Sequence, residues 1–514
     1  MTHFLVQMDL LYLSPMNSTR FVLTILWSVS FSPMVTSLSA QSPDLLRRMY
    51  RHHEEVREEG LDQRRFKHPE VMARIQALKS DPDFGISTAG YSVQGREIKA
   101  VRWGSGPVKV LLWTQMHGDE PTATLSTFDL WNALRDPDFL PEANKWKKQL
   151  TLVFLPLLNP DGALVYDRQN ALGIDLNRDA LRLTSPEARI LKHWRDSLSA
   201  DWGFNLHDQH RYYSAGNTNL TSAIAFLAPP PDEKRSQPPH RQDAMRLIGG
   251  LSNGLQKLIP GQVAKYSDAF EPRAFGDNFT KWGTRTILIE AGWLPGDTEK
   301  QTLRRLYFAT LVAALDGIAN QSFNQVPVKA YSDIPFNQNR LTDLLIREVQ
   351  VQVGKGTYLV DICYKHEEST GPDGRTWRRQ PAIAEIGDLS PYGAYTILEG
   401  QGEWTLVPAA THPHVMTGMD ELRAEPWTDL ILSGTAVARM ANVTNDQRMA
   451  NTPLALRHLD DNANEPVYPG MNPTFYLRDQ RGNLRYLIVN GIAWDLRSPE
   501  WRSALHDLLS GGLD

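Results

Sequence analysis

The chain has 514 residues, of which 41% are hydrophobic and 22% are charged, and its formal net charge is −5. This composition is typical of a globular protein, and a chain of this length divides into more than one domain. The acidic balance lacks the basic footprint of a nucleic-acid-binding protein. Because Cys363 is the single cysteine, an internal disulfide framework and a cysteine-based zinc site are excluded. A metal would therefore be held by histidine and carboxylate.

The N-terminus predicts an export signal. Arg20 precedes an apolar-rich run over residues 21–31, and small residues follow up to Ala40. This order is typical of a secretory signal, and the run is too short to span a bilayer, which takes about 20 residues. We therefore predict a signal peptide over residues 1–40, cut after Ser39 or Ala40, with Met16 as a candidate start. The mature protein would be secreted or periplasmic, without a membrane span; a buried N-terminal helix is the alternative.

Residues 41–84 predict a densely charged helical segment. Within it, His52 and Glu55 have the His-x-x-Glu spacing of a metal site. On a helix they are i,i+3 neighbours among other charged residues, and no apolar strand leads into them. A solvated helix face explains this pair.

Residues 85–321 alternate short apolar runs with helical patterns, which predicts an α/β domain around a sheet. The predicted strands are 97–103, 108–115, 150–157, 202–206, 223–228 and 285–291, and the predicted helices are 122–135, 185–199, 241–258 and 298–318. From about residue 325 to residue 514 the pattern becomes β-rich, which predicts an accessory domain. Two similar segments, 342–353 and 428–439, indicate a weak internal repeat and two related β-modules.

Polar side chains stand where the predicted strands end. His117 and Glu120 follow the strand 108–115, and strand ends are where α/β sheets place ligand-binding loops. A catalytic zinc site needs a third ligand and one position open for water. His207 and Glu290 end two further strands and are the candidates, whereas His210 lies beyond its strand and ranks lower. A carboxylate such as Glu290, emerging from an apolar run, is costly unless it has a partner or a role.

The stretch between these strands adds further motifs. It contains Asn159-Pro160-Asp161-Gly162, Arg168 and Gly173-Ile174-Asp175-Leu176-Asn177-Arg178. Together with His117-x-x-Glu120, His207 and Glu290, in this order, the set resembles the carboxypeptidase A-type zinc metallopeptidases, the funnelins. The resemblance implies a mixed central sheet flanked by helices.

The resemblance also implies a metal centre. His117, Glu120 and His207 would bind one Zn²⁺, whose charge acidifies a water molecule. Glu290 would take the proton of that water and pass it to the leaving amine. Asp175 would orient the first histidine through its second ring nitrogen.

Three further residues would contact the substrate, which the resemblance implies to be a peptide with a free C-terminal carboxylate. Arg168 would face the oxyanion that develops as the carbonyl is attacked. Asn177 and Arg178 would hold the terminal carboxylate, for which a guanidinium is a planar two-pronged donor. The implied function is that of an exported zinc-dependent metallocarboxypeptidase.

The chain departs from the family pattern in places. Asp179-Ala180 stands where many relatives have asparagine and an aromatic residue. A mobile tyrosine that often caps the pocket has no clear counterpart, since Tyr266 and Phe270 are both candidates. Asp277 lies where side-chain specificity is often set, and would favour a basic residue.

Two other functions remain open. One is an N-acyl amino acid deacylase, like the aspartoacylase branch, on the same scaffold. The other is a non-catalytic binding protein in which the β-rich region does the work. A non-catalytic relative is expected to lose Glu290 or a metal ligand, and none is lost here.

Overall fold

The computed structural model describes residues 41–461 and 465–510, so the predicted signal peptide lies outside the described residues. An eight-stranded sheet forms the first part, in the order β1-β2-β4-β3-β5-β9-β7-β8. Its strands are β1 (Phe84–Tyr91), β2 (Glu97–Trp103), β3 (Val108–Thr114), β4 (Leu150–Leu155), β5 (Trp202–Asp208), β7 (Ile224–Leu227), β8 (Val263–Lys265) and β9 (Arg285–Ala291). The central strands β4, β3, β5 and β9 are parallel, whereas β2 and β7 join them antiparallel. The sheet is therefore mixed, as the sequence predicts.

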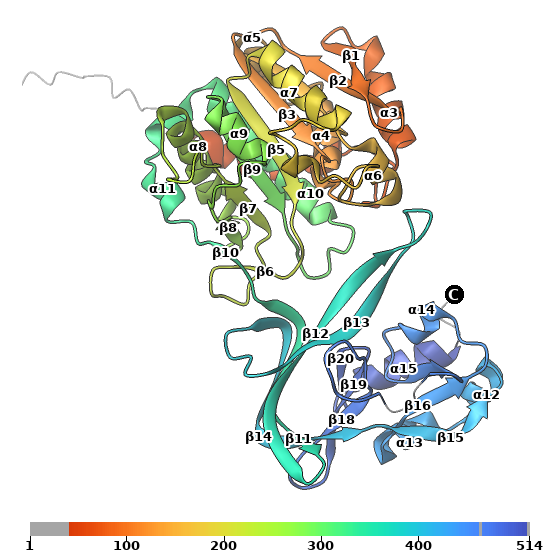
Figure 1. Cartoon of the computed structure of the whole chain (residues 1–514). Coiled ribbons are helices and arrows are strands. Elements are labelled where there is room, and N and C mark those ends of the chain that lie inside the picture. The colour runs from red at the N-terminus through yellow and green to blue at the C-terminus, as the bar shows by residue number, and fades with distance from the viewer. Residues whose placement is uncertain (1–40, 462–464, 511–514) are drawn as a thin grey trace, which may run out of the picture. The chain divides into compact units, whose positions relative to one another are not determined.

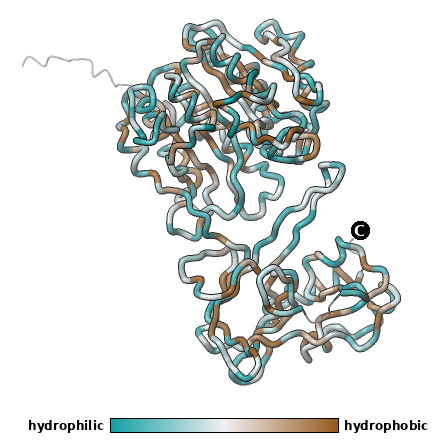
Figure 2. Tube along the Cα trace, in the orientation of Figure 1, coloured by the Kyte–Doolittle hydropathy of each residue, from teal (hydrophilic) through white to brown (hydrophobic). Residues whose placement is uncertain are grey.

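Helices cover both faces of this sheet (Figure 1). Along β3, Val110 and Leu112 belong to one apolar cluster and Leu111 and Trp113 to another, because successive side chains of a strand point to opposite faces. The first face packs against α1 (Gln41–Arg51), α4 (Thr122–Ala133), α5 (Leu140–Gln149), α8 (Pro239–Leu255) and α10 (Gln301–Ala319). The second packs against α7 (Pro186–Leu198) and α9 (Phe275–Lys281). Figure 2 shows hydrophobic stretches inside this region and hydrophilic ones on its outer loops.

Shorter elements complete the α/β part. They are α2 (His53–Val56), α3 (His68–Ala77), η1 (Leu78–Ser80), α6 (Pro160–Val165), η2 (Leu176–Arg178), β6 (Tyr213–Ala215), η3 (Ser322–Gln325), α11 (Lys329–Ser332) and β10 (Asn337–Asn339). None of the described helices combines the length and the apolar character that a membrane crossing requires.

The charged N-terminal segment packs onto the α/β part. Glu55 is exposed, and the ring of His52 lies nearer to Asp136 (Nε2–Oδ1 3.1 Å) than to Glu55 (Nδ1–Oε2 3.8 Å). The next residue, His53, is buried and contacts Asp129 (Nε2–Oδ2 2.9 Å). The first His-x-x-Glu of the chain is thus part of a packed helix, and Glu55 takes no part in a metal cluster of the described residues.

A buried ion pair stabilises this junction. Arg304 donates to both oxygens of Asp129, at 2.7 and 2.5 Å, and both side chains are fully buried. Burial raises the pKa of Asp129, but the hydrogen bonds from His53 and Arg304 outweigh it, and the net pKa is lowered. The ionised form of Asp129 therefore depends on the positive charge of Arg304.

We expect Arg304→Met to lower the free energy of unfolding by about 3–5 kcal/mol, because it leaves a buried carboxylate with reduced compensation. Chemical denaturation at neutral pH measures this change. Arg47→Met removes an exposed pair with Asp44 and is the control, for which a change within about 1 kcal/mol is expected. Equal losses in the two variants would contradict the assigned role of Arg304.

The C-terminal part is β-rich, as predicted. A seven-stranded sheet has the order β13-β12-β11-β14-β18-β19-β20, and a three-stranded sheet has the order β15-β16-β17. The strands are β11 (Leu341–Val353), β12 (Gly356–Thr370), β13 (Trp377–Gly387), β14 (Gly393–Pro408), β15 (Ala410–Met416), β16 (Thr435–Met440), β17 (Ala455–His458), β18 (Phe475–Arg478), β19 (Leu484–Val489) and β20 (Ile492–Asp495). The helices are α12 (Met419–Ala424), α13 (Trp427–Ser433), α14 (Asn445–Arg448) and α15 (Glu500–Ser510).

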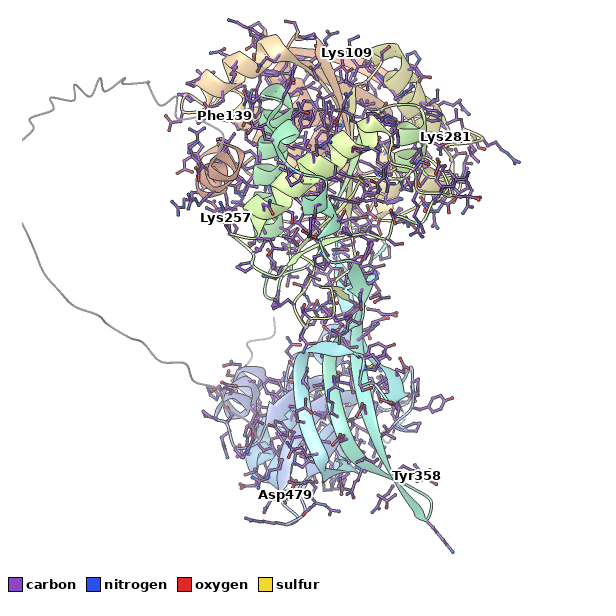
Figure 3. The ribbon with its side chains drawn as sticks, turned by 90° about the vertical axis from the view of Figure 1, so that its left-hand side faces the viewer. Lys109, Phe139, Lys257, Lys281, Tyr358 and Asp479 are labelled. Atoms are coloured by element: carbon purple, nitrogen blue, oxygen red, sulfur yellow. The ribbon has the colours of Figure 1, made fainter. Side chains whose placement is uncertain are left out.

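The predicted internal repeat has no counterpart among these described elements. Residues 342–353 lie in one long strand, β11, whereas residues 428–439 cover helix α13 and strand β16. Two short apolar runs of similar sequence thus fold differently, because such a run is compatible with a strand or a buried helix. The hairpin β11–β12 ends in an exposed tip near Tyr358, which is 57% exposed (Figure 3).

Candidate functional site

The carboxyl ends of β3, β5 and β9 bring the predicted site residues together. His117 and Glu120 lie in the turn between β3 and α4, while His207 lies in β5. Glu290 lies in β9, directly opposite His207 in the parallel register. Residues widely separated in the chain therefore meet at one edge of the sheet and line one cleft of about 870 Å³.

The turn between His117 and Glu120 requires a glycine directly after His117. A Cβ on Gly118 would lie 2.2 Å from the backbone nitrogen of Ala163 and from the backbone carbon of Gly162 in helix α6. That helix is capped by Asn159, whose Oδ1 accepts a hydrogen bond from the Gly162 nitrogen at 2.9 Å. The NPDG segment thus supports the turn that carries His117.

His117, Glu120 and His207 have the geometry of a metal site. Nδ1 of His117 lies 2.8 Å from Oε1 of Glu120, and Nδ1 of His207 lies 2.7 Å from Oε2 of the same carboxylate. The two Nδ1 atoms are 3.1 Å apart. Ligand atoms at tetrahedral zinc, with Zn–N of 2.0–2.1 Å, lie about 3.3 Å from one another. Two nitrogens held this close around one carboxylate fit the donor set of Zn²⁺.

Asp175 fixes the tautomer of His117. Its Oδ1 lies 2.9 Å from Nε2 of His117, so with a metal bound Nε2 would donate to Asp175 and Nδ1 would be the ligand atom. Burial lowers the pKa of His117, but Glu120 and the hydrogen bond to Asp175 raise it to about 9. The pKa of Asp175 is lowered, because His117 and Arg168 outweigh the effect of burial.

Glu120 is ionised despite its burial. Burial raises its pKa, but the charges and hydrogen bonds of His117 and His207 lower it well below its usual range. Its Oε2 also accepts from the backbone nitrogen of Asp208 at 3.2 Å. The carboxylate is therefore fixed between the two imidazoles.

Glu290 has an oxygen free for chemistry. Its Oε2 is buried and has no hydrogen-bond partner among the described residues. Burial raises its pKa, and the charges of Glu120 and Asp208 raise it further. A cation at the neighbouring ligands would act in the opposite direction and favour the ionised form.

The predicted arginine and asparagine residues line the same cleft. Arg168 donates through Nη1 to Glu120 Oε1 at 3.1 Å and through Nε to Asp175 Oδ2 at 3.1 Å. Arg178 is 3.4 Å from Glu271 (Nε–Oε2), and its side chain is 39% exposed. The Oδ1 of Asn177 accepts from the nitrogen of Phe275, which ties the amide to α9.

Tyr266 and Asp277 also line the cleft. Burial raises the pKa of Tyr266, and the charge of Glu290 raises it further. Asp277 lies in α9, and burial raises its pKa to about 7. His210 also lines the cleft but stacks on Tyr213 at 4.3 Å between ring centroids, outside the metal-ligand cluster.

Sequence reasoning missed other residues of the cleft. Lys300, just before α10, is paired with Asp208 (Nζ–Oδ2 2.9 Å), and both are buried. Arg64 and Arg65 come from the charged N-terminal segment, and Glu368 comes from β12 in the region expected to be accessory. The sequence did not indicate these residues, because Arg64 and Arg65 lie in a charged segment and Glu368 lies inside a strand. Neither position follows the end of an apolar strand, which is the pattern that predicted the site.

A second group of possible ligands lies elsewhere. His52, Asp136 and Asp138 are close enough to share an ion, but Asp138 is exposed and none of the three lines the cleft.

Comparisons with known proteins point to one family. The family model described as zinc carboxypeptidase matches residues 71–257. The chain is 29% identical over 112 residues to "Probable carboxypeptidase 2" of Trichophyton verrucosum (strain HKI 0517) and of Arthroderma benhamiae (strain ATCC MYA-4681 / CBS 112371). Each match covers 21% of this chain and 20% of the relative, so the chain spans about a fifth of the length of these curated relatives.

Solved structures with a similar arrangement include two carboxypeptidases. The metallo-carboxypeptidase from Burkholderia cenocepacia is 18% identical with a TM-score of 0.39, over 49% of this chain and 70% of that one. The carboxypeptidase A from Helicoverpa armigera is 14% identical with a TM-score of 0.39, over 55% of this chain and 81% of that one.

Proposed function

Residues 71–257 belong to the zinc carboxypeptidase family, as the sequence motifs predict, and we propose that the protein is a zinc-dependent metallocarboxypeptidase. It hydrolyses the amide bond next to the free C-terminal carboxylate of a peptide. The observation that carries this proposal is the convergence of two imidazole nitrogens on one buried carboxylate, with Glu290 on the neighbouring strand. Export by the predicted signal over residues 1–40 is part of the proposal.

Three residues would hold the metal. His117, Glu120 and His207 present Nδ1, the carboxylate and Nδ1, and Asp175 holds the first imidazole in the tautomer that can ligate. Bound Zn²⁺ supplies a Lewis acid that makes a water molecule nucleophilic at neutral pH. With Glu120 ionised, the site carries one negative charge that offsets the charge of the ion.

Glu290 moves the proton. Its unpartnered Oε2 accepts a proton from water as the scissile carbonyl is attacked, and the same oxygen then returns the proton to the leaving amine. Burial raises the pKa of this carboxyl, which retains the proton until the amine takes it, whereas a bound cation would lower the pKa and keep the carboxylate ready to accept the proton. Arg168 stabilises the negative charge that develops on the carbonyl oxygen, for which its exposed guanidinium has donors to spare.

Arg178 binds the terminal carboxylate of the substrate. Its guanidinium donates through Nη1 to the backbone oxygen of Asn177 at 2.8 Å, while its contact with Glu271 is 3.4 Å long and the side chain is 39% exposed. The remaining N–H groups of this planar fork are suited to a two-pronged contact with a substrate carboxylate. Asn177 supports this arginine by anchoring η2 to the start of α9.

A peptide library with varied C-terminal residues tests the proposal. The purified protein is expected to release single C-terminal amino acids, to lose this activity with a chelator and to regain it with Zn²⁺. N-acyl amino acids are assayed in parallel, and preferential release from these compounds would favour a deacylase. Hydrolysis of neither class by zinc-loaded protein would contradict the proposal and favour a binding protein.

Asp277 gives the proposed specificity a pH dependence. Because its pKa is raised to about 7, it is neutral below that pH and charged above it, while a substrate lysine stays charged throughout. We expect the kcat/KM ratio of C-terminal lysine to C-terminal glutamine to rise between about pH 6 and about pH 8. Asp277→Asn is expected to flatten this rise. A ratio that does not depend on pH in the unchanged protein would remove Asp277 from specificity.

A further inference from the structure

Two adjacent arginines in the cleft have no part in the proposed mechanism. Arg64 and Arg65 follow helix α2 and line the same cleft as His117 and Glu290. They are only 6% and 3% exposed. A pair of buried guanidinium groups is costly unless an anion compensates it, so their partners indicate what this end of the cleft is built to bind.

Aromatic rings hold these guanidinium groups. Cζ of Arg65 lies 4.1 Å from the ring centroid of Tyr166 and 5.2 Å from that of Trp377. Cζ of Arg64 lies 5.1 Å from the same Trp377 ring. Tyr166 follows helix α6 of the catalytic region, whereas Trp377 begins strand β13 of the C-terminal region. The stacking fixes the planes of both guanidinium groups without neutralising their charge.

One carboxylate serves both arginines. Oε2 of Glu368, in β12, accepts from Nη2 of Arg64 at 2.6 Å and from Nη2 of Arg65 at 3.5 Å. Nε and Nη1 of Arg65 have no acceptor among the described residues. Burial lowers the pKa of Arg65, and the charge of Arg64 contributes in the same direction.

A third guanidinium adds to the uncompensated positive charge of this cluster. Arg379 lies over the same Trp377 ring at 5.4 Å, and the described residues provide no ion pair for it within 4 Å. Burial lowers its pKa, and the charge of Arg211 lowers it further. Three arginines thus surround one tryptophan, with a single carboxylate directly bonded to two of them.

These arginines lie in the cleft but apart from the residues proposed to hold the C-terminal carboxylate. Arg178 contacts Glu271 and the backbone of Asn177, and among the described residues it shares no hydrogen-bond or ion-pair partner with Arg64 or Arg65. A peptide with its terminal carboxylate at Arg178 and its last amide at the metal ligands must continue into the rest of the cleft. Arg64 and Arg65 form one of the charged walls there.

We propose that Arg64 and Arg65, stacked on Tyr166 and Trp377, bind an acidic side chain of the peptide substrate on the N-terminal side of the scissile bond. This inference rests on the proposed function and narrows its substrate class to acidic peptides. Glu368 shows that a carboxylate fits between the two guanidinium groups, and its single negative charge leaves one of the two positive charges uncompensated. The C-terminal region thereby contributes to specificity through β12 and β13.

Matched peptides test the inference. Peptides that share their two C-terminal residues carry either glutamate or glutamine at one position further upstream, and kcat/KM is measured for each. We expect glutamate to be favoured at one position by about tenfold, mainly through KM, since hydrogen bonds to charged groups are the strong ones. Arg65→Gln is expected to bring this ratio to about one, whatever its effect on the absolute rates of the two peptides. Arg47→Gln, which removes an exposed charge on α1, should leave the ratio unchanged.

Two further variants separate binding from folding. Arg65→Lys keeps the charge but loses the planar fork, and an intermediate ratio with an unchanged melting temperature is expected. Glu368→Gln removes the internal competitor, so it should increase the preference for the glutamate peptide. A decreased preference in Glu368→Gln would overturn the inference.

A binding measurement keeps the inference distinct from the proposed function. Both peptides are titrated into Glu290→Gln protein by calorimetry, where hydrolysis does not interfere. Tighter binding of the glutamate peptide, lost on adding Arg65→Gln, supports the inference even if the unchanged enzyme hydrolyses neither peptide. Equal binding of the two peptides at every position overturns it, whatever the outcome for hydrolysis.

Discussion

Glu290→Gln is expected to lower kcat by about 10²–10⁴-fold while the protein still binds one equivalent of Zn²⁺. The amide keeps the size of the side chain but cannot accept the proton of the attacking water. The proposed ligands His117, Glu120 and His207 are untouched, so metal content measured by atomic absorption should equal that of the unchanged protein. Single-turnover rates on the best peptide of the library give the change in kcat.

A control variant and the zinc content together decide what this result means. Glu271→Gln alters another carboxylate of the same cleft, one that contacts Arg178 rather than the metal ligands. It is expected to change KM more than kcat. Unchanged turnover in Glu290→Gln would remove Glu290 from the mechanism, and loss of zinc together with turnover would make it a ligand instead.

His207→Ala is expected to abolish zinc-dependent activity and zinc-dependent stabilisation together. The unchanged protein should melt at a higher temperature with Zn²⁺ than with a chelator, because a ligand that binds only the folded state stabilises it, by about 2.7 kcal/mol at 100 times Kd. With one of three ligands removed, the variant should show little of this shift. Differential scanning calorimetry with and without added Zn²⁺ measures both proteins.

His210→Ala is the matched control for this prediction. His210 lies three residues further along and lines the same cleft, but its ring stacks on Tyr213. The zinc-dependent shift in melting temperature should remain in this variant. If His210→Ala loses the shift and His207→Ala keeps it, the assignment of the third ligand is wrong.

The central strands and the candidate metal ligands could both be predicted, because both follow from strands that are buried on both faces of the sheet. Strands β3, β5 and β9 are buried on both faces, so they read as apolar runs, and a polar residue at the end of such a run stands out. The observed bounds of β2 and β9 match the predicted ranges 97–103 and 285–291. The parallel order of the strands then places their carboxyl ends at one edge.

Other features could not be predicted because distant contacts create them. Strand β1 lies at the sheet edge with a half-exposed pattern, which leaves a weak apolar signal. The role proposed for Arg65 depends on its contacts with Tyr166 and Trp377, which are far away in the sequence. The segment 428–439 predicted a repeat of the segment 342–353, but the structure has α13 followed by β16 there, since a short apolar run alone does not determine its periodicity.

The pairing of His207 with Glu290 has a consequence for how this site tolerates change. The two residues sit opposite each other on strands held together by backbone hydrogen bonds, so their spacing is set by the ladder and not by any connecting loop. Insertions in the surrounding loops can therefore reshape what enters the cleft while the distance between ligand and base persists. A shift of that ladder by a single residue would instead turn one of the two side chains to the opposite face of the sheet, and both would be lost to the reaction at once.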